Sequence, residues 1–151
     1  MKVTGTLTKV DRLPYQARLL LRSCSHKDIS SVSVTGSTEE LKLPELGRKI
    51  TIDVRLWLVS KISKSDTHLA HFIIQNSRGV NGTEVFAQVT DVLPEGDGFI
   101  CKIVGIEGEL VVETERDLQP EIGVDVYFSG ELTTGIEQVA PSKTDSRLSD
   151  S

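Results

Sequence analysis

The segment Asp66-Thr67-His68-Leu69-Ala70-His71 holds the residues best suited to bind a metal ion. The apolar residues at 72–74 indicate a strand, in which His68 and His71 face opposite sides of a sheet. Two histidines that point apart cannot share one metal ion, and no nearby cysteine or second carboxylate completes a tetrahedral ligand set. We therefore expect ordinary surface histidines and no metal site.

Other arrangements typical of catalysis are missing from the sequence. His26 lies in a polar stretch beside Lys27 and Asp28, and no serine or cysteine occurs in a recognisable nucleophile motif. The 12 glycines are scattered and form no phosphate-binding loop. The sequence therefore favours a non-enzymatic protein without a cofactor.

Strand-like alternation dominates the chain. From Ile50 to Leu58, apolar residues occupy every even position, which is the two-residue period of a half-buried strand. Similar stretches, separated by turn residues, lie at 3–10, 17–24, 31–35, 69–74, 85–92, 99–104, 110–113 and 124–132. Helical turns are expected only at 38–41 and 116–119, each ended by a nearby proline. The pattern predicts an all-β fold.

An internal repeat divides the chain. Residues 3–10 align with 85–92, and each segment is followed closely by a Leu-Pro pair. Residues 43–47 align with 119–123, each before a predicted strand. We interpret this as a duplicated β-module, against the alternative of chance similarity between β-rich segments. The expected boundaries are 1–77 for a basic module, 78–82 for a short joint, 83–141 for an acidic module and 142–151 for a disordered tail.

The order of elements in each copy predicts the fold. Three strands, a short helical turn, a glycine, a fourth strand and a shorter fifth strand follow one another, as in the five-stranded OB-fold barrel. We therefore expect two tandem small β-barrels that are OB-fold-like. A pair of SH3-like barrels, which share short strands and a late helical turn, is the alternative.

Three short segments carry a family resemblance. The strand Gly123–Leu132 resembles the fourth strand of bacterial single-stranded-DNA-binding proteins and primosomal replication proteins, in which a glycine precedes an alternating strand that ends in Gly-x-Leu. Residues 47–52 and the opening Gly5-Thr6-Leu7 are similar. The resemblance implies binding of single-stranded DNA. The chain departs from these proteins in having few aromatic residues and a tail that ends in Ser151.

Basic and aromatic residues of the first module form a candidate nucleic-acid site. OB-folds bind oligonucleotides on the outer face of the second and third strands and through adjoining loops. Cationic groups there would follow phosphates and aromatic rings would stack on bases. The alternative is a solvated basic face, with the tryptophan in a packing contact between the modules. The candidate residues are Arg12, Tyr15, Arg18, Arg22, Arg55, Trp57, Lys61 and Lys64.

Charge is unevenly distributed along the chain. Residues 1–80 hold 13 basic and 7 acidic residues, a net +6, whereas residues 81–151 hold 4 and 15, a net −11. An acidic surface repels phosphate. If the protein binds nucleic acid, we therefore expect the first module to be the one that does so. We expect the second module to serve a protein partner, self-association or a contact with the basic module.

Composition limits the class of protein. The chain is 26% charged and 38% hydrophobic, and it has no apolar run long enough to cross a bilayer. Its first residues do not read as a secretory signal, and Cys24 and Cys101 belong to no C-x-x-C pair, so both are expected to be reduced. The Asn81-Gly82 pair is interpreted as a turn rather than a glycosylation site. These features predict a cytoplasmic protein.

The sequence is compatible with more than one class of function. The first is a non-enzymatic protein that binds single-stranded nucleic acid through its basic barrel. The second is a protein–protein adaptor or assembly subunit with no nucleic-acid role, favoured by the net charge of −5, the few aromatic residues and the many short strand edges. A third, weaker possibility is that the acidic module imitates nucleic acid toward a basic protein.

Overall fold

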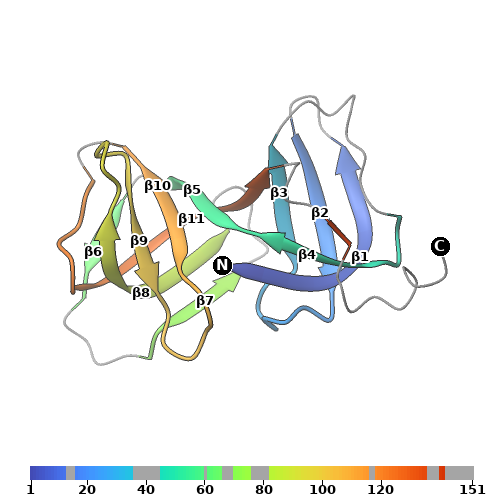
Figure 1. Cartoon of the computed structure of the whole chain (residues 1–151), viewed down its shortest axis with the longest axis horizontal. Helices are drawn as coiled ribbons and strands as arrows, with labels where there is room; N and C mark the ends of the chain where they lie inside the picture. The colour runs from blue at the N-terminus through green and yellow to red at the C-terminus, as the bar shows by residue number, and fades with distance from the viewer. Residues whose placement is uncertain are drawn as a thin grey trace. The chain divides into compact units, whose positions relative to one another are not determined.

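All regular elements that the structure describes are strands. The computed structural model describes residues 1–12, 16–35, 45–59, 61–65, 70–75, 82–115, 118–135 and 140–141, and it confirms the all-β prediction (Figure 1). The predicted helical turn at 38–41, the joint and the tail lie wholly or mostly outside these residues, as does half of the turn at 116–119. Within the described ranges, no helix is long and apolar enough to span a membrane.

The chain forms two compact units. Unit 1 comprises Met1 and Arg55–Leu132, and unit 2 comprises Lys2–Val54 and Thr133–Ser151. This division differs from the expected one at residues 78–82. The chain passes from one unit to the other after Val54, returns after Leu132, and does not cross between units at the predicted joint.

Unit 2 is a barrel built around β1. The strands β1 (Lys2–Arg12), β2 (Gln16–Arg22) and β3 (Ser31–Thr35) are antiparallel neighbours, and β4 (Lys49–Asp53) pairs with the other edge of β1. The end of β11 (Asp125–Gly135) pairs in parallel with β3, and β12 (Ala140–Pro141) pairs with β4. The Thr134 hydroxyl donates to the Asp53 carbonyl at 2.7 Å, which connects β11 to β4.

Unit 1 is a closed barrel. The strands β8 (Thr83–Val92), β9 (Gly98–Lys102) and β10 (Leu110–Thr114) are antiparallel neighbours. The strand β5 (Arg55–Val59) pairs in parallel with β10, and β11 closes the ring between β5 and β8. Two short strands lie outside the ring, because β6 (Ile62–Lys64) pairs with β11 and β7 (Phe72–Gln75) pairs with β8.

Both units have the strand order of an OB-fold. In each, the third strand has the second strand on one side and a parallel fifth strand on the other, and the first strand pairs with the second and the fourth. The expectation of OB-fold-like barrels is confirmed.

Backbone contacts confirm the internal repeat. The first strand of each barrel shifts register at a threonine, Thr8 or Thr90, whose hydroxyl donates to a carbonyl of the second strand at 3.1 or 3.2 Å. A glycine before the fourth strand, Gly47 or Gly123, has a positive φ of 85° or 90°. Its N–H donates to Leu7 in unit 2 and to Val89 in unit 1, at 2.7 and 2.8 Å. Such a backbone conformation favours glycine, which explains why the repeat preserves it.

Each barrel takes its fifth strand from the continuation of the other barrel's fourth strand. β4 of unit 2 continues after Val54 as β5 of unit 1, and β11 of unit 1 continues after Leu132 as the fifth strand of unit 2. The predicted alternation holds from Ile50 to Leu56, but Leu58 is 50% exposed because β5 bulges there, with φ 59° at Leu58.

The cores of the two barrels differ in composition. Unit 2 is filled by aliphatic side chains such as Leu7, Leu19 and Ile50, all fully buried. Unit 1 buries aromatic rings, and Phe99 meets Phe128 edge-to-face at 5.3 Å. Gly130 belongs to the Gly-x-Leu motif, and a Cβ there would lie 2.6 Å from the Trp57 carbonyl oxygen. The motif glycine therefore permits β11 to approach β5 closely.

The exchange of fifth strands predicts which fragments fold. A fragment of residues 55–132 contains every strand of the unit 1 barrel, whereas a fragment of residues 78–151 lacks β5. Loss of β5 removes the buried Leu56 and Val59, at about 1.5–3 kcal/mol each. We expect cooperative thermal unfolding of 55–132 by circular dichroism and none for 78–151. Cooperative melting of 78–151 alone would contradict the exchange.

Candidate functional site

The outer face of β2 carries cationic side chains in unit 2. Arg18, Leu20 and Arg22 alternate on this face, and their neighbours on β1 are Asp11, Lys9 and Thr6, respectively. Arg22 and Lys9 are exposed, whereas Arg18 and Leu20 are half-buried. We call the set Lys9, Arg18, Leu20 and Arg22 the β2 face.

Arginines of the β2 face are free to bind an anion. Asp11 forms an ion pair with Lys9 at 3.3 Å, and within the described part of the chain neither Arg18 nor Arg22 is in an ion pair. Ser33 lies opposite Arg18 on β3 and adds no charge. An apolar side chain between two guanidinium groups gives a base or another flat ring a surface to rest on. The β2 face can therefore contact an extended polyanion.

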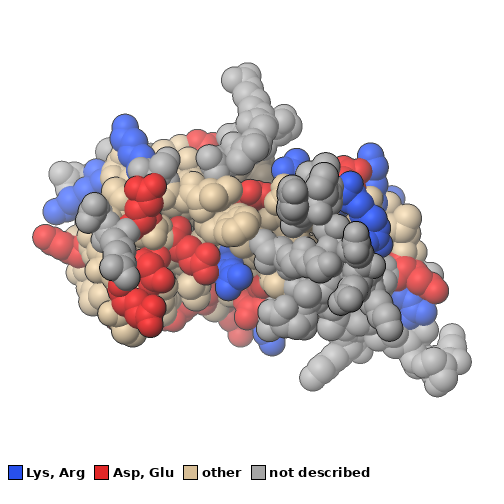
Figure 2. Space-filling model, turned by 90° about the horizontal axis from the view of Figure 1, so that it is seen from above, with Lys and Arg blue, Asp and Glu red and all other residues tan. Residues whose placement is uncertain are grey.

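Equivalent positions in unit 1 carry less positive charge and more negative charge. The repeat places Asp91 where unit 2 has Lys9, Gly98 where it has Arg18 and Glu113 where it has Ser33. Only Lys102, which corresponds to Arg22, keeps its positive charge. At Gly98 a Cβ would lie 2.1 Å from the Val112 carbonyl oxygen, so no side chain fits there. Figure 2 shows acidic side chains gathered on the visible face of unit 1, at the left.

Counting charge by unit changes the balance expected from the two halves of the sequence. Unit 2 holds 11 basic and 9 acidic residues, a net +2, and unit 1 holds 6 and 13, a net −7. The difference arises because residues 55–80, with a net charge of +3, belong to unit 1, and residues 133–151, with a net charge of −1, belong to unit 2. Unit 2 therefore remains the more basic of the two, but its positive excess is small.

The candidate nucleic-acid residues are divided between the two units. Arg12, Arg18 and Arg22 lie in unit 2, and Tyr15 is outside the described residues. The other four, Arg55, Trp57, Lys61 and Lys64, lie in unit 1. The sequence placed all eight residues in one groove of the first module, whereas the structure assigns them to two units. Nucleic-acid binding by these residues stays a prediction.

The unit 1 candidates differ in their surroundings. Arg55 is paired with Glu113 at 3.5 Å, which neutralises it. Trp57 is half-buried, and its indole N–H is buried without a partner among the described residues. A half-buried ring offers less surface for base stacking than the exposed ring that the sequence suggested. Lys61 and Lys64 remain exposed.

His71 has a structural role that the sequence did not reveal. Its Nδ1 accepts a hydrogen bond from the Val104 N–H at 3.1 Å, so Nε2 carries the proton and donates to Asp125 at 3.0 Å. The ring also packs edge-to-face on Phe86 at 5.4 Å, and the side chain is only 9% exposed. His71 therefore connects the residue before β7 to the turn after β9 and to β11. His68 lies outside the described residues.

Three titratable groups in the described part of the chain have a raised pKa. Burial raises the pKa of the Cys101 thiol to about 12, and burial also raises the pKa of Cys24. The Tyr127 hydroxyl donates to Glu84, and this bond raises the pKa of Tyr127. Among the residues that the structure describes, no three His, Cys, Asp or Glu side chains come together as a metal site.

Comparison with known proteins leaves the assignment at the level of fold. The chain matches no protein-family model and no curated protein. Among solved structures it is similar to the cytoplasmic molybdate-binding protein ModG with molybdate bound, at 12% identity, 93% coverage of each chain and a TM-score of 0.45. A likeness of this size assigns neither a family nor a ligand. The strand pairing defines the class, an all-β protein of two OB-fold-like barrels.

The two thiols predict different reactivity in the native protein. Cys101 is 0% exposed with a pKa of about 12, so almost none of it is thiolate at pH 8, whereas Cys24 is half-buried. We expect iodoacetamide at pH 8 to modify Cys24 long before Cys101, with similar rates in urea. In the Cys24→Ser variant Cys101 is the only remaining thiol, so mass spectrometry of this variant measures the labelling rate of Cys101 alone. Rapid native labelling of that variant would contradict the buried thiol.

The bonds of His71 predict a stability effect. His71→Ala leaves Asp125 and the Val104 N–H without this partner, which costs about 1–3 kcal/mol of unfolding free energy. Lys27→Ala is the control, expected to change it by less than about 0.5 kcal/mol because its side chain is exposed in the turn after β2. Urea denaturation measures both. Equal effects of the two substitutions would contradict the role of His71.

Proposed function

We propose that the protein is a non-enzymatic binding protein of the cytoplasm and that unit 2 binds single-stranded nucleic acid on its β2 face. The observation that carries the proposal is that two of the three cationic positions of the β2 face are acidic or uncharged at the equivalent positions of unit 1. Lys9 and Arg18 in unit 2 correspond to Asp91 and Gly98 in unit 1. The outer face of the second and third strands is where OB-folds bind oligonucleotides.

Binding on this face would depend mainly on phosphates. Tyr15 is the only aromatic residue of the sequence within unit 2, so base stacking contributes little there. Arg18, Arg22 and Lys9 supply two or three cationic contacts, because Asp11 partly offsets Lys9. Affinity is then modest, and preference among base sequences is weak, because phosphate contacts do not read bases.

Salt dependence tests the proposal. With two or three phosphate contacts, affinity for a fluorescein-labelled oligo-dT falls about 7- to 20-fold between about 50 and 200 mM salt. Fluorescence anisotropy measures this fall, and a duplex of the same length is the control for strand selectivity. Absence of binding at the lower salt, or equal affinity for the duplex, would overturn the proposal.

A matched pair of charge reversals localises the site. Arg22→Glu removes one phosphate contact and adds a repulsive charge, so it should weaken oligo-dT binding about tenfold or more. Lys102→Glu makes a similar charge reversal at the equivalent position of unit 1 and should change affinity less than about twofold. Equal losses in the two variants would show that overall charge, and not the β2 face, governs binding.

The adaptor hypothesis has its own supporting observation. Unit 1 exposes large apolar side chains, with Val104 at 72%, Ile122 at 59% and Tyr127 at 38%. Exposed apolar groups next to charged ones are typical of protein contacts. Self-association seen by analytical ultracentrifugation, together with absent oligo-dT binding, would favour this second function.

A further inference from the structure

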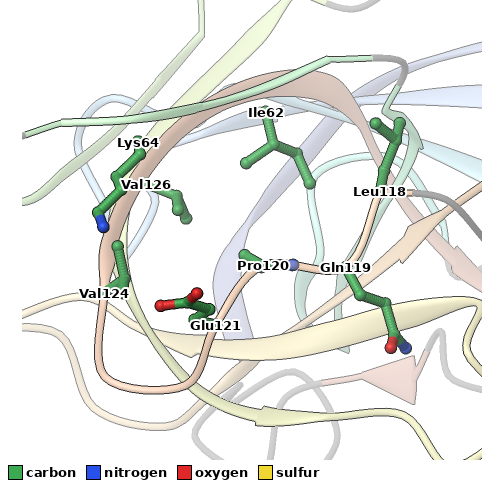
Figure 3. A pocket seen from close by; sticks show the side chains of 8 residues that line it. All are labelled: Ile62, Lys64, Leu118, Gln119, Pro120, Glu121, Val124 and Val126. Carbon is green, nitrogen blue, oxygen red and sulfur yellow. The ribbon is translucent and has the colours of Figure 1, made fainter.

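Unit 1 contains a cavity that the proposed nucleic-acid function does not use. It has a volume of about 320 Å³ and lies between β6, the segment 118–121 and the start of β11. This volume is within the range of small-molecule sites, about 300–1,000 Å³. Figure 3 shows the cavity with its lining side chains, which are Ile62, Lys64, Leu118, Gln119, Pro120, Glu121, Val124 and Val126.

The lining is mostly apolar. Ile62, Leu118 and Val126 come from three different segments, and Val126 is 1% exposed. The segment 118–121 is held to the barrel, because the Gln119 amide donates to the carbonyls of Gly98 at 3.2 Å and Leu93 at 3.4 Å. In Figure 3 this amide lies away from the other polar groups. An anchored wall gives the cavity a defined shape without a bound ligand.

Opposite charges stand at one side of the cavity. Lys64 lies beside Val126 in the pairing of β6 with β11, and Glu121 precedes that strand. Both side chains are directed to the same side of the cavity in Figure 3, where Ile62 and Leu118 form the other side. Within the described residues neither forms an ion pair. The ammonium and the carboxylate are therefore available to a ligand.

We propose that this cavity binds a free α-amino acid with a branched apolar side chain. The carboxylate of the ligand would pair with Lys64, its ammonium group with Glu121 and its side chain would contact Ile62, Leu118 and Val126. A zwitterion pairs with both Lys64 and Glu121, whereas a simple anion or cation leaves one of these two charges without a partner from the ligand. The proposal is independent of the β2 face, which lies in unit 2.

Four ligands test this chemistry on the full-length protein. L-leucine carries all three recognition groups, leucinamide lacks the carboxylate, N-acetyl-leucine lacks the ammonium group and L-alanine lacks the branched side chain. We expect isothermal titration calorimetry to detect L-leucine, and each of the other three to bind about tenfold or more weakly. If leucinamide or N-acetyl-leucine binds as tightly as L-leucine, the zwitterion assignment is overturned. Absence of L-leucine binding at a concentration on the order of 10 mM would also overturn it.

Two variants place the ligand in the cavity. Lys64→Met and Glu121→Gln preserve side-chain length while removing charge, and each should weaken L-leucine about 10- to 100-fold. Lys102→Met and Glu95→Gln are exposed controls outside the lining and should leave affinity unchanged. Thermal melting verifies that all four variants fold. Unchanged affinity of Lys64→Met and Glu121→Gln for L-leucine would overturn the site. Oligo-dT binding is measured on the same two variants, and it should be unaffected because the β2 face lies in unit 2.

Discussion

The parallel pairing of third and fifth strands is the constraint on which both barrels depend. A strand that pairs in parallel cannot come from a tight hairpin with its neighbour and needs a long connection. Here the chain meets that requirement by continuing each fourth strand straight into the other unit, after Val54 and after Leu132. The Gly-x-Leu motif serves this arrangement, since Gly130 allows β11 to approach β5 at Trp57.

Duplication with divergence explains how one architecture presents two different surfaces. The threonine bulges at Thr8 and Thr90 and the glycines at 47 and 123 keep the same backbone contacts, so equivalent side chains occupy equivalent places. Outward positions are free to change sign, while inward positions keep only their apolar character. Leu19 and Phe99 illustrate the second point, because both are fully buried at the same position in barrels of different composition.

The sequence predicted the strands and the fold but not the path of the chain between barrels. Period-two alternation identified the strand from Ile50, and the repeat identified the OB-fold order. The alternation of apolar and polar residues continues unchanged through Val54, where the chain passes from one barrel to the other. A strand shows this alternation in either barrel, so the pattern does not reveal the crossover. The role of His71 depends on partners distant in sequence, Val104 and Asp125, so local patterns could not indicate it.

The exchange of fifth strands also sets the order in which the barrels can be completed during synthesis. Domains usually fold from the N-terminus as they leave the ribosome. In this chain all strands of unit 1 have been made once residue 132 is added, whereas the strands of unit 2, begun at Lys2, still lack residues 133–135. The first barrel to be started is therefore the last to be finished. Until residues 133–135 have been made, β3 exposes an unpaired edge that is open to pairing with another strand.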